Sequence, residues 1–340
     1  MAENKTKKRI YIVTGANGFL GNNIVRKLQE QKCEIRALVL LDDKSPALDG
    51  LDCKKYFGDI TNIDSLKDIF DVPKNAEVFV IHCAAFVYIK AKNNQKVFDI
   101  NVNGTKNIVQ KVLEINAKLI YVNSVHAITE KPNGEVMTEI TDFDSTKVVG
   151  CYAKSKAMAA KYVLQMVKEK GLNACIMQPS GIIGPNDYSG THLTQLFIVF
   201  ANRKLPACVK GGYDFVDVRD VADGVISACD KGKAGECYIL SNEFVPVLSL
   251  VNMCADVLEK KRLKSLFPMW FARMFASFAE LYYNIKKQTP LFTSYSLYTL
   301  RSNSNFSHKK ADKELGYKTR NIYETVKDTV LWLKEVGKIK

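Results

Sequence analysis

The chain has 340 residues, 47% of them hydrophobic and 25% charged, which excludes a disordered protein and leaves room for one or two folded domains. The net charge of +13 comes without a basic patch interleaved with aromatic residues, so we expect no nucleic-acid partner. Nine cysteines without a Cys-x-x-Cys pair indicate free thiols in a reducing cytoplasm and no metal site. Residues 1–8 predict a disordered basic tail, and no apolar signal core precedes Ile10.

A glycine-rich turn near the start of the chain organises the predicted fold. An apolar, strand-like run ends at Thr14, and Gly15, Gly18 and Gly21 follow at a spacing of three before a helical pattern. Gly15 allows a turn that a Cβ would block, Gly18 lets a pyrophosphate approach the backbone, and Gly21 lets the helix pack closely on the strand. This order predicts a dinucleotide site at the helix N-terminus.

Strand-like and helix-like segments alternate through the first half of the chain. The alternation predicts an α/β fold: a doubly wound parallel sheet of the Rossmann type with helices on both faces. The strands are near-continuous apolar runs, as expected where both faces are buried. The expected strands are 9–14, 34–40, 54–57, 78–83, 118–123 and 173–178, and the expected helices are 19–31, 62–70, 97–116 and 152–170.

The pattern changes after Pro179, and we expect a smaller, mostly helical C-terminal domain that binds the substrate. The predicted elements in this part are helices over 192–203 and 221–231 and strands over 215–218 and 237–240. The predicted domains are a dinucleotide-binding domain, 9–179 with a return segment at 213–240, and a substrate-binding domain, 180–212 with 241–340.

Residues 266–283 are apolar almost throughout, interrupted by Arg273, Ser277 and Glu280. A membrane-spanning helix is longer and free of charge in its middle. We therefore expect a buried helix that forms a wall of an apolar pocket, and docking on a membrane surface is the less favoured alternative.

Tyr152, Lys156 and Ser124 are candidates for proton transfer. Tyr152 and Lys156 are four residues apart at the start of a predicted helix and so share one face. A nearby ammonium group favours the phenolate and lowers the pKa of a tyrosine, so this pair can move a proton on and off a substrate oxygen. Ser124 ends a predicted strand at the sheet edge where doubly wound folds bind ligands.

These motifs, in this order and spacing, resemble the extended short-chain dehydrogenase/reductase family, within the NAD-dependent epimerase/dehydratase superfamily. The similarity covers nearly the whole chain, with later signatures at 215–222 and 310–317. The resemblance implies that the following residues bind the cofactor: Gly15, Asn17, Gly18, Phe19, Leu20, Gly21, Asp59, Ile60, Cys83, Ala84, Ala85, Asn101, Tyr152, Lys156, Pro179, Ser180 and Ile182.

The resemblance also implies catalytic roles. Tyr152 would be the acid/base, Lys156 would lower its pKa and hold the nicotinamide ribose, and Ser124 would position the substrate oxygen. The cofactor supplies the hydride chemistry. His126 either faces the substrate or packs as a structural histidine.

The choice between NAD and NADP is weakly specified. Members that use NAD carry an acid at the end of the second strand, and members that use NADP often carry an arginine just after it. Val39 and Leu40 stand at those places here. Asp42 and Asp43 would repel a 2′-phosphate and Lys44 would attract one, so the sequence slightly favours NAD.

The substrate is the second point at which the sequence departs from part of the family. Members that act on nucleotide sugars usually carry an arginine at the position of Tyr213, although Arg203, Arg219 and Arg301 could replace it. The C-terminal half looks closest to the dihydroflavonol reductase and 3β-hydroxysteroid dehydrogenase branch.

We therefore expect a cytoplasmic NAD(P)-dependent oxidoreductase that interconverts a secondary alcohol and a ketone on a mostly apolar small molecule. The alternatives are a nucleotide-sugar epimerase or dehydratase that retains NAD, and a dinucleotide-binding regulator without turnover. A homodimer is compatible with the sequence.

Overall fold

The computed structural model describes residues 7–31, 33–88, 94–268 and 294–340. Its centre is a seven-stranded sheet in which every neighbouring pair of strands is parallel. The strand order runs outward from β1 in both directions, which is the doubly wound order that the sequence predicts. Across the sheet the strands are β10 (Cys237–Leu240), β6 (Ala174–Pro179), β5 (Lys118–Val122), β4 (Glu77–His82), β1 (Arg9–Thr14), β2 (Glu34–Val39) and β3 (Lys54–Phe57).

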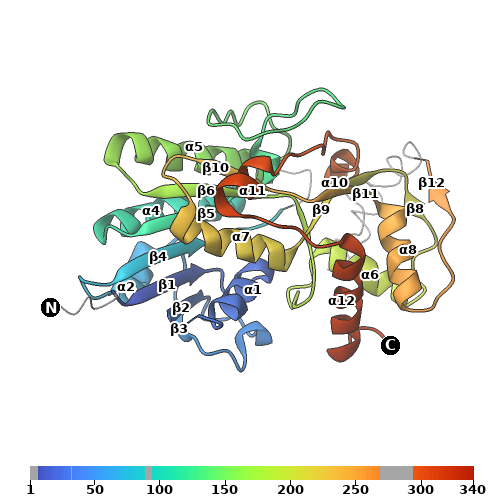
Figure 1. The fold of residues 1–340 in the computed structure, drawn as a ribbon, viewed down its shortest axis with the longest axis horizontal. Helices are drawn as coiled ribbons and strands as arrows, with labels where there is room; N and C mark the ends of the chain where they lie inside the picture. The colour runs from blue at the N-terminus through green and yellow to red at the C-terminus, as the bar shows by residue number, and fades with distance from the viewer. Residues whose placement is uncertain (1–6, 32, 89–93, 269–293) are drawn as a thin grey trace.

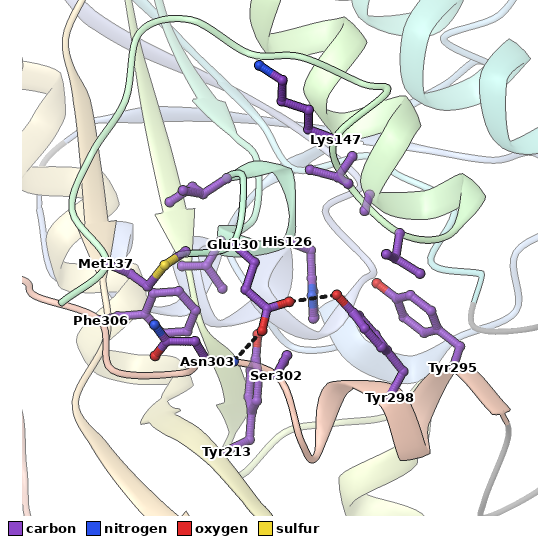
Figure 2. Close-up of a pocket in the computed structure, with 15 residues that line it drawn as sticks. His126, Glu130, Met137, Lys147, Tyr213, Tyr295, Tyr298, Ser302, Asn303 and Phe306 are labelled. Carbon is purple, nitrogen blue, oxygen red and sulfur yellow. Dashed lines mark hydrogen bonds between the residues drawn. The ribbon is translucent and has the colours of Figure 1, made fainter. Parts of the chain in front are cut away.

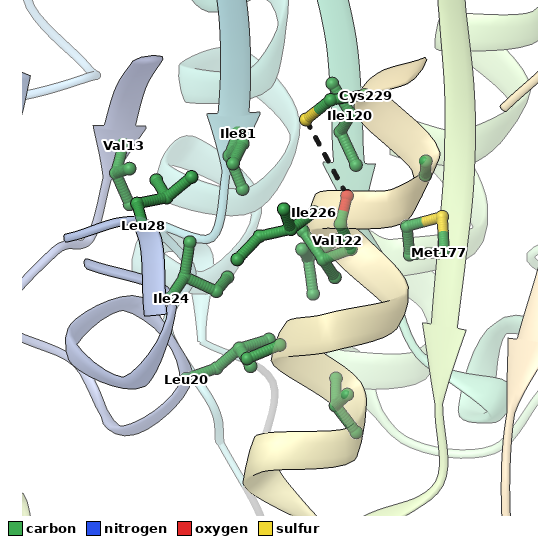
Figure 3. Close-up of a cluster of buried hydrophobic side chains, with 14 of the residues drawn as sticks. Val13, Leu20, Ile24, Leu28, Ile81, Ile120, Val122, Met177, Ile226 and Cys229 are labelled. Atoms are coloured by element: carbon green, nitrogen blue, oxygen red, sulfur yellow. Dashed lines mark hydrogen bonds between the residues drawn. The ribbon is translucent and has the colours of Figure 1, made fainter. Parts of the chain in front are cut away.

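Helices cover both faces of this sheet (Figure 1). Alternate strand residues point to opposite faces, so Tyr11 packs in one core cluster and Ile10 in the other. Figure 3 shows the first cluster, where Ile24 of α1 faces Ile226 of α7. The first face carries α1 (Phe19–Leu28), α7 (Val218–Lys231) and α11 (Lys309–Leu315), and the second carries α2 (Lys67–Phe70), α4 (Thr105–Glu114) and α5 (Cys151–Lys170).

Two expectations about the edge of the sheet were wrong. The terminal strand β3 is largely exposed and not a buried apolar run, because it has a neighbour on one side only and carries Lys54 and Lys55. Lys8, which the sequence placed in a disordered tail, is held at the sheet: its carbonyl accepts a hydrogen bond from the Glu77 N–H, and its ammonium pairs with Glu34 at 2.6 Å.

Two predicted helices are interrupted. The segment 97–116 consists of α3 (Gln95–Phe98), a π-helical turn (Asp99–Gly104) and α4, and the segment 62–70 is a 3₁₀ turn (Ile63–Leu66) followed by α2. Periodicity cannot distinguish these helix types because each segment is only one or two turns long, too short to show a repeat other than 3.6 residues. The segment predicted as a strand over 215–218 ends one residue earlier, since Val218 begins α7.

The C-terminal part forms its own core beside the sheet (Figure 1). A separate three-stranded sheet contains β7 (Gly181–Ile183), β9 (Gly212–Asp217) and β11 (Glu243–Pro246). Of the predicted return segment 213–240, therefore, β10 joins the large sheet and α7 packs on it, whereas β9 does not belong to that sheet. The surrounding elements are α6 (His192–Ala201), α8 (Val247–Val257), α10 (Ser294–Thr299), α12 (Ile322–Glu335) and the short pair β8 (Cys208–Val209) with β12 (Leu266–Phe267).

The apolar segment 266–283 falls mostly outside the described residues. Only Leu266, Phe267 and Pro268 are described, and all three are exposed. None of the helices that the structure describes is both long and apolar enough to cross a membrane. The domain boundaries given above stay a prediction.

Candidate active site

The glycine turn after β1 has the geometry that its spacing predicts. Gly15 adopts φ +64°, and an added Cβ would lie 2.8 Å from the backbone of Ala84. A Cβ on Gly21 would collide with the carbonyl oxygen of Gly15, so only glycine lets α1 approach the turn. Gly18 stands at the N-cap of α1 and offers no side-chain cap, which leaves N–H groups of the first helical turn for an anion.

A cavity of about 690 Å³ runs from this turn along the carboxyl ends of the strands. Most of the expected cofactor residues and all three expected catalytic residues line it: Gly15, Gly18, Phe19, Leu20, Gly21, Cys83, Ala85, Ser124, Tyr152, Lys156, Pro179, Ser180 and Ile182. Asn17, in the same turn, is not among the lining residues, and its buried side-chain oxygen has no hydrogen-bond partner within the described part of the chain. The glycine turn, the uncapped helix and this unpaired oxygen fit a dinucleotide.

The remaining expected cofactor residues do not line this cavity. Asp59 is exposed, and its carboxylate accepts two hydrogen bonds from Thr61, each 2.8 Å long. Ile60 packs against Gly104, where a Cβ would lie within 2.7 Å of its side chain. Ala84 donates its N–H to Thr14. Their expected roles in binding stay predictions.

Asn101 acts as a clamp between two segments that border the cavity. Its side chain accepts a hydrogen bond from the Phe86 N–H at 2.7 Å and donates to the Phe86 carbonyl and to the Ser155 hydroxyl. Ser155 in turn donates to the carbonyl oxygen of Tyr152. Asn101 lies in the π-helical turn, a feature frequent at functional sites, and it ties the loop after β4 to the first turn of α5.

Three elements bring the expected catalytic residues together. Ser124 follows β5 and caps a short 3₁₀ turn (Val125–Ala127), while Tyr152 and Lys156 lie one turn apart at the start of α5. All three side chains are buried and line the same cavity. The Lys156 ammonium donates to the Val122 carbonyl at 2.8 Å and lies 5.1 Å from the centre of the Tyr121 ring.

The protonation equilibria differ from the expectation that Lys156 lowers the pKa of Tyr152. Burial raises the pKa of Tyr152 to about 12, and a hydrogen bond with Ser124 opposes this rise only in part. Burial also lowers the pKa of Lys156 to about 7, which weakens the cation at neutral pH. Sequence spacing places the two residues on one face but does not report how deeply the fold buries them.

A second, apolar cavity of about 260 Å³ adjoins the first at Val87, His126 and Tyr295, which line both. Its other walls come from α6, β9, α8 and α10, with Leu193, Leu196, Phe215, Val247 and Leu300 among them. Neither Tyr295 nor His192, which also lines this cavity, could be identified from the sequence, because no motif surrounds either residue.

His126 stands where the cavities meet. Its ring stacks on Tyr213, with centres 5.6 Å apart and planes 14° apart, and lies edge-on to Tyr152 at 6.3 Å. Figure 2 shows it beside a small pocket in which Glu130 accepts hydrogen bonds from the Tyr298 hydroxyl and the Asn303 N–H. Burial lowers the pKa of His126 to about 4, so the ring is neutral at physiological pH.

The comparisons with known proteins agree with this architecture. The family described as NAD dependent epimerase/dehydratase matches residues 11–241. Sterol demethylase protein B of Methylococcus capsulatus is 28% identical over 334 residues, 96% of this chain and 99% of that protein. A putative dihydroflavonol 4-reductase of Synechocystis is also 28% identical, over 97% of this chain and 96% of that protein.

Solved structures share the fold. The crystal structure of gox2253 is 30% identical, with a TM-score of 0.83 over 97% of this chain and 99% of that one. A dTDP-glucose 4,6-dehydratase from Bacillus anthracis, in complex with NAD, is 19% identical with a TM-score of 0.73, over 96% of this chain and 97% of that one. With the family matched over more than half of its length, the chain belongs to the NAD-dependent epimerase/dehydratase family, whose members are short-chain dehydrogenase/reductase enzymes.

Proposed function

We propose that the protein is an NAD(P)-dependent oxidoreductase that interconverts a secondary alcohol and a ketone on a mostly apolar small molecule. The observation that carries the proposal is the apolar cavity beside Ser124 and Tyr152, whose described lining contains no arginine or lysine. Small-molecule pockets are usually apolar, with a few polar groups that fix orientation. The names of the sterol- and dihydroflavonol-related relatives point the same way.

Each of the three expected catalytic residues would have its own role in the reaction. Tyr152 donates a proton to the carbonyl oxygen in reduction and accepts it from the alcohol in oxidation. Ser124 hydrogen-bonds the same oxygen, and Lys156 holds the ribose next to the nicotinamide. The bound dinucleotide supplies or accepts the hydride.

The charged groups near the cavities argue against a nucleotide-sugar substrate. A diphosphate needs cations that bond it in a forked geometry. Arg219 is already paired with Asp217 and Asp328, each at 2.7 Å. Arg203 and Arg301 are exposed and line neither cavity. Tyr213 occupies the place where nucleotide-sugar members of the family usually carry an arginine, and its ring stacks on His126.

Thermal-shift measurements with NADH present distinguish the two substrate classes. We expect apolar ketones such as deoxybenzoin to raise the melting temperature and to be reduced, and UDP-glucose to do neither. Stabilisation by UDP-glucose alone would favour the epimerase or dehydratase alternative. Tightly retained NAD, detected by mass spectrometry of the purified protein, would favour it as well. Binding without turnover of either class would favour a regulator.

We further propose that NAD binds at least as tightly as NADP, in a cytoplasmic enzyme. Val39 is buried at the end of β2, and the next residues, Leu40 and Leu41, are exposed and uncharged. Asp42 and Asp43 follow and would repel a 2′-phosphate. Calorimetric titration with both cofactors tests the preference, and a preference for NADP that disappears in Lys44→Ala would contradict it. None of the nine cysteines, all of which lie in the described residues, forms a disulfide, as suits a reducing compartment.

A further inference from the structure

Two histidines near the site, His82 and His126, differ in how their ring nitrogens are bonded. His82 is hydrogen-bonded at both ring nitrogens: Nδ1 to the Thr14 hydroxyl at 2.7 Å and Nε2 to the Thr105 hydroxyl at 3.1 Å. Because Thr105 donates its own proton to the Asn101 carbonyl, Nε2 must be the donor and Nδ1 the acceptor. His82 is therefore a structural link between β1, β4 and α4.

His126 has no such links. Its ring nitrogens make no hydrogen bond to any of the residues that the structure describes, and the ring is partly accessible. It lines the cofactor cavity, the apolar cavity and the small pocket of Figure 2. Its ring stacks on Tyr213, lies edge-on to Tyr152 and lies tilted against Tyr295, with ring centres 5.9 Å apart in the last pair. The ring of His126 is positioned by contacts with other aromatic rings, and its nitrogens are available to form a hydrogen bond with a ligand.

We propose that His126 is a specificity-determining residue that hydrogen-bonds a second oxygen of the substrate, on a carbon next to the reacting carbonyl. The ring centres of His126 and Tyr152 are 6.3 Å apart, a separation at which the two side chains can bond oxygens on neighbouring carbons. A neutral imidazole has one donor and one acceptor, so it suits a hydroxyl or a ketone oxygen and offers no charge to a phosphate.

This inference rests on the proposed oxidoreductase function and narrows it to apolar ketones that carry an adjacent oxygen. Unpaired polar groups in a closed site are costly, so a substrate that satisfies His126 is preferred over one that leaves it unpaired. The apolar walls, Leu193 and Leu300 among them, would contact the hydrocarbon parts.

The test compares benzoin with deoxybenzoin, two diphenyl ketones that differ only in the hydroxyl next to the carbonyl. With saturating NADH, we expect kcat/KM of the natural protein to be about tenfold higher for benzoin, the scale of one hydrogen bond. In His126→Phe, which keeps a ring to stack on Tyr213, the ratio of kcat/KM for benzoin to kcat/KM for deoxybenzoin falls to about one. A loss of activity that is the same for both ketones does not change this ratio. In His126→Asn, whose amide also donates and accepts, part of the ratio returns.

The control is His308→Phe, the same change at a histidine that bonds Ser241 and lines none of the three cavities around His126; its ratio should equal that of the natural protein. A ratio near one in the natural protein, or an unchanged ratio in His126→Phe, overturns the role of His126 while deoxybenzoin turnover still supports the oxidoreductase. If neither ketone is bound or reduced, the proposed function and the role of His126 both fail.

Discussion

The two cavities that meet at His126 and Tyr295 are lined by different kinds of structure. The cofactor cavity is lined by turns at the carboxyl ends of β1, β4, β5 and β6 and by the side chains of Ser124, Tyr152 and Lys156. The apolar cavity is lined by side chains from segments far apart in the chain, from Val87 to Leu300.

This difference explains why one family serves many substrates. The backbone turns are fixed by glycines that tolerate no Cβ, such as Gly15 and Gly21, so the dinucleotide site changes little. The side chains of the apolar cavity can change without disturbing the sheet, and they set which molecule is presented to Tyr152. Function in such folds is carried by the site and not by the architecture.

The largest effect is expected at Tyr152, which lines the cofactor cavity and lies edge-on to His126. Tyr152→Phe removes the proton donor and little volume, so kcat should fall by about 10²–10⁴-fold, the usual contribution of general acid–base catalysis. The dissociation constant for NADH should stay nearly the same because the phenyl ring still packs at the start of α5. Steady-state kinetics with calorimetry checks both values. Turnover close to that of the natural protein would remove Tyr152 from the reaction.

A change at the glycine turn of the cofactor cavity should weaken cofactor binding and leave the fold intact. Gly18→Val places a branched side chain where the phosphates bind, and we expect NADH to bind about 10- to 100-fold more weakly. The fold should persist, since a Cβ at Gly18 meets only the Gly15 oxygen at 3.0 Å. Gly21→Ala is the contrasting variant, and it should lower the melting temperature. Unchanged NADH affinity in a folded Gly18→Val protein would contradict the assignment.

The same comparison shows what could be predicted from sequence. The sheet, the glycine turn and the trio of Ser124, Tyr152 and Lys156 depend on local spacing or on strand ends that parallel pairing brings together, and these were predicted. The position of Tyr295 beside His126 depends on how α10 packs on the sheet edge, which no local pattern encodes. The raised pKa of Tyr152 and the exposed edge strand β3 depend on burial, which only the assembled fold determines.

The smallest effect is expected inside the apolar cavity. Leu193 of α6 is half-buried and lines this cavity. Leu193→Ala removes apolar contact that is the same for the bound ketone and for the transition state, so KM should rise about tenfold while kcat changes little. Initial rates over a range of deoxybenzoin concentrations give both constants, and NADH affinity should not change.

The matched control is Ile198→Ala, on the same helix and also half-buried, at a residue outside the cavity lining. It should leave KM unchanged, because the removed contact is with the C-terminal core and not with a ligand. An equal rise of KM in both variants would mean that α6 acts through stability. A fall of kcat in Leu193→Ala with KM unchanged would mean that the side chain contributes only in the transition state, and the cavity would then be part of the catalytic machinery and not a wall that selects substrates.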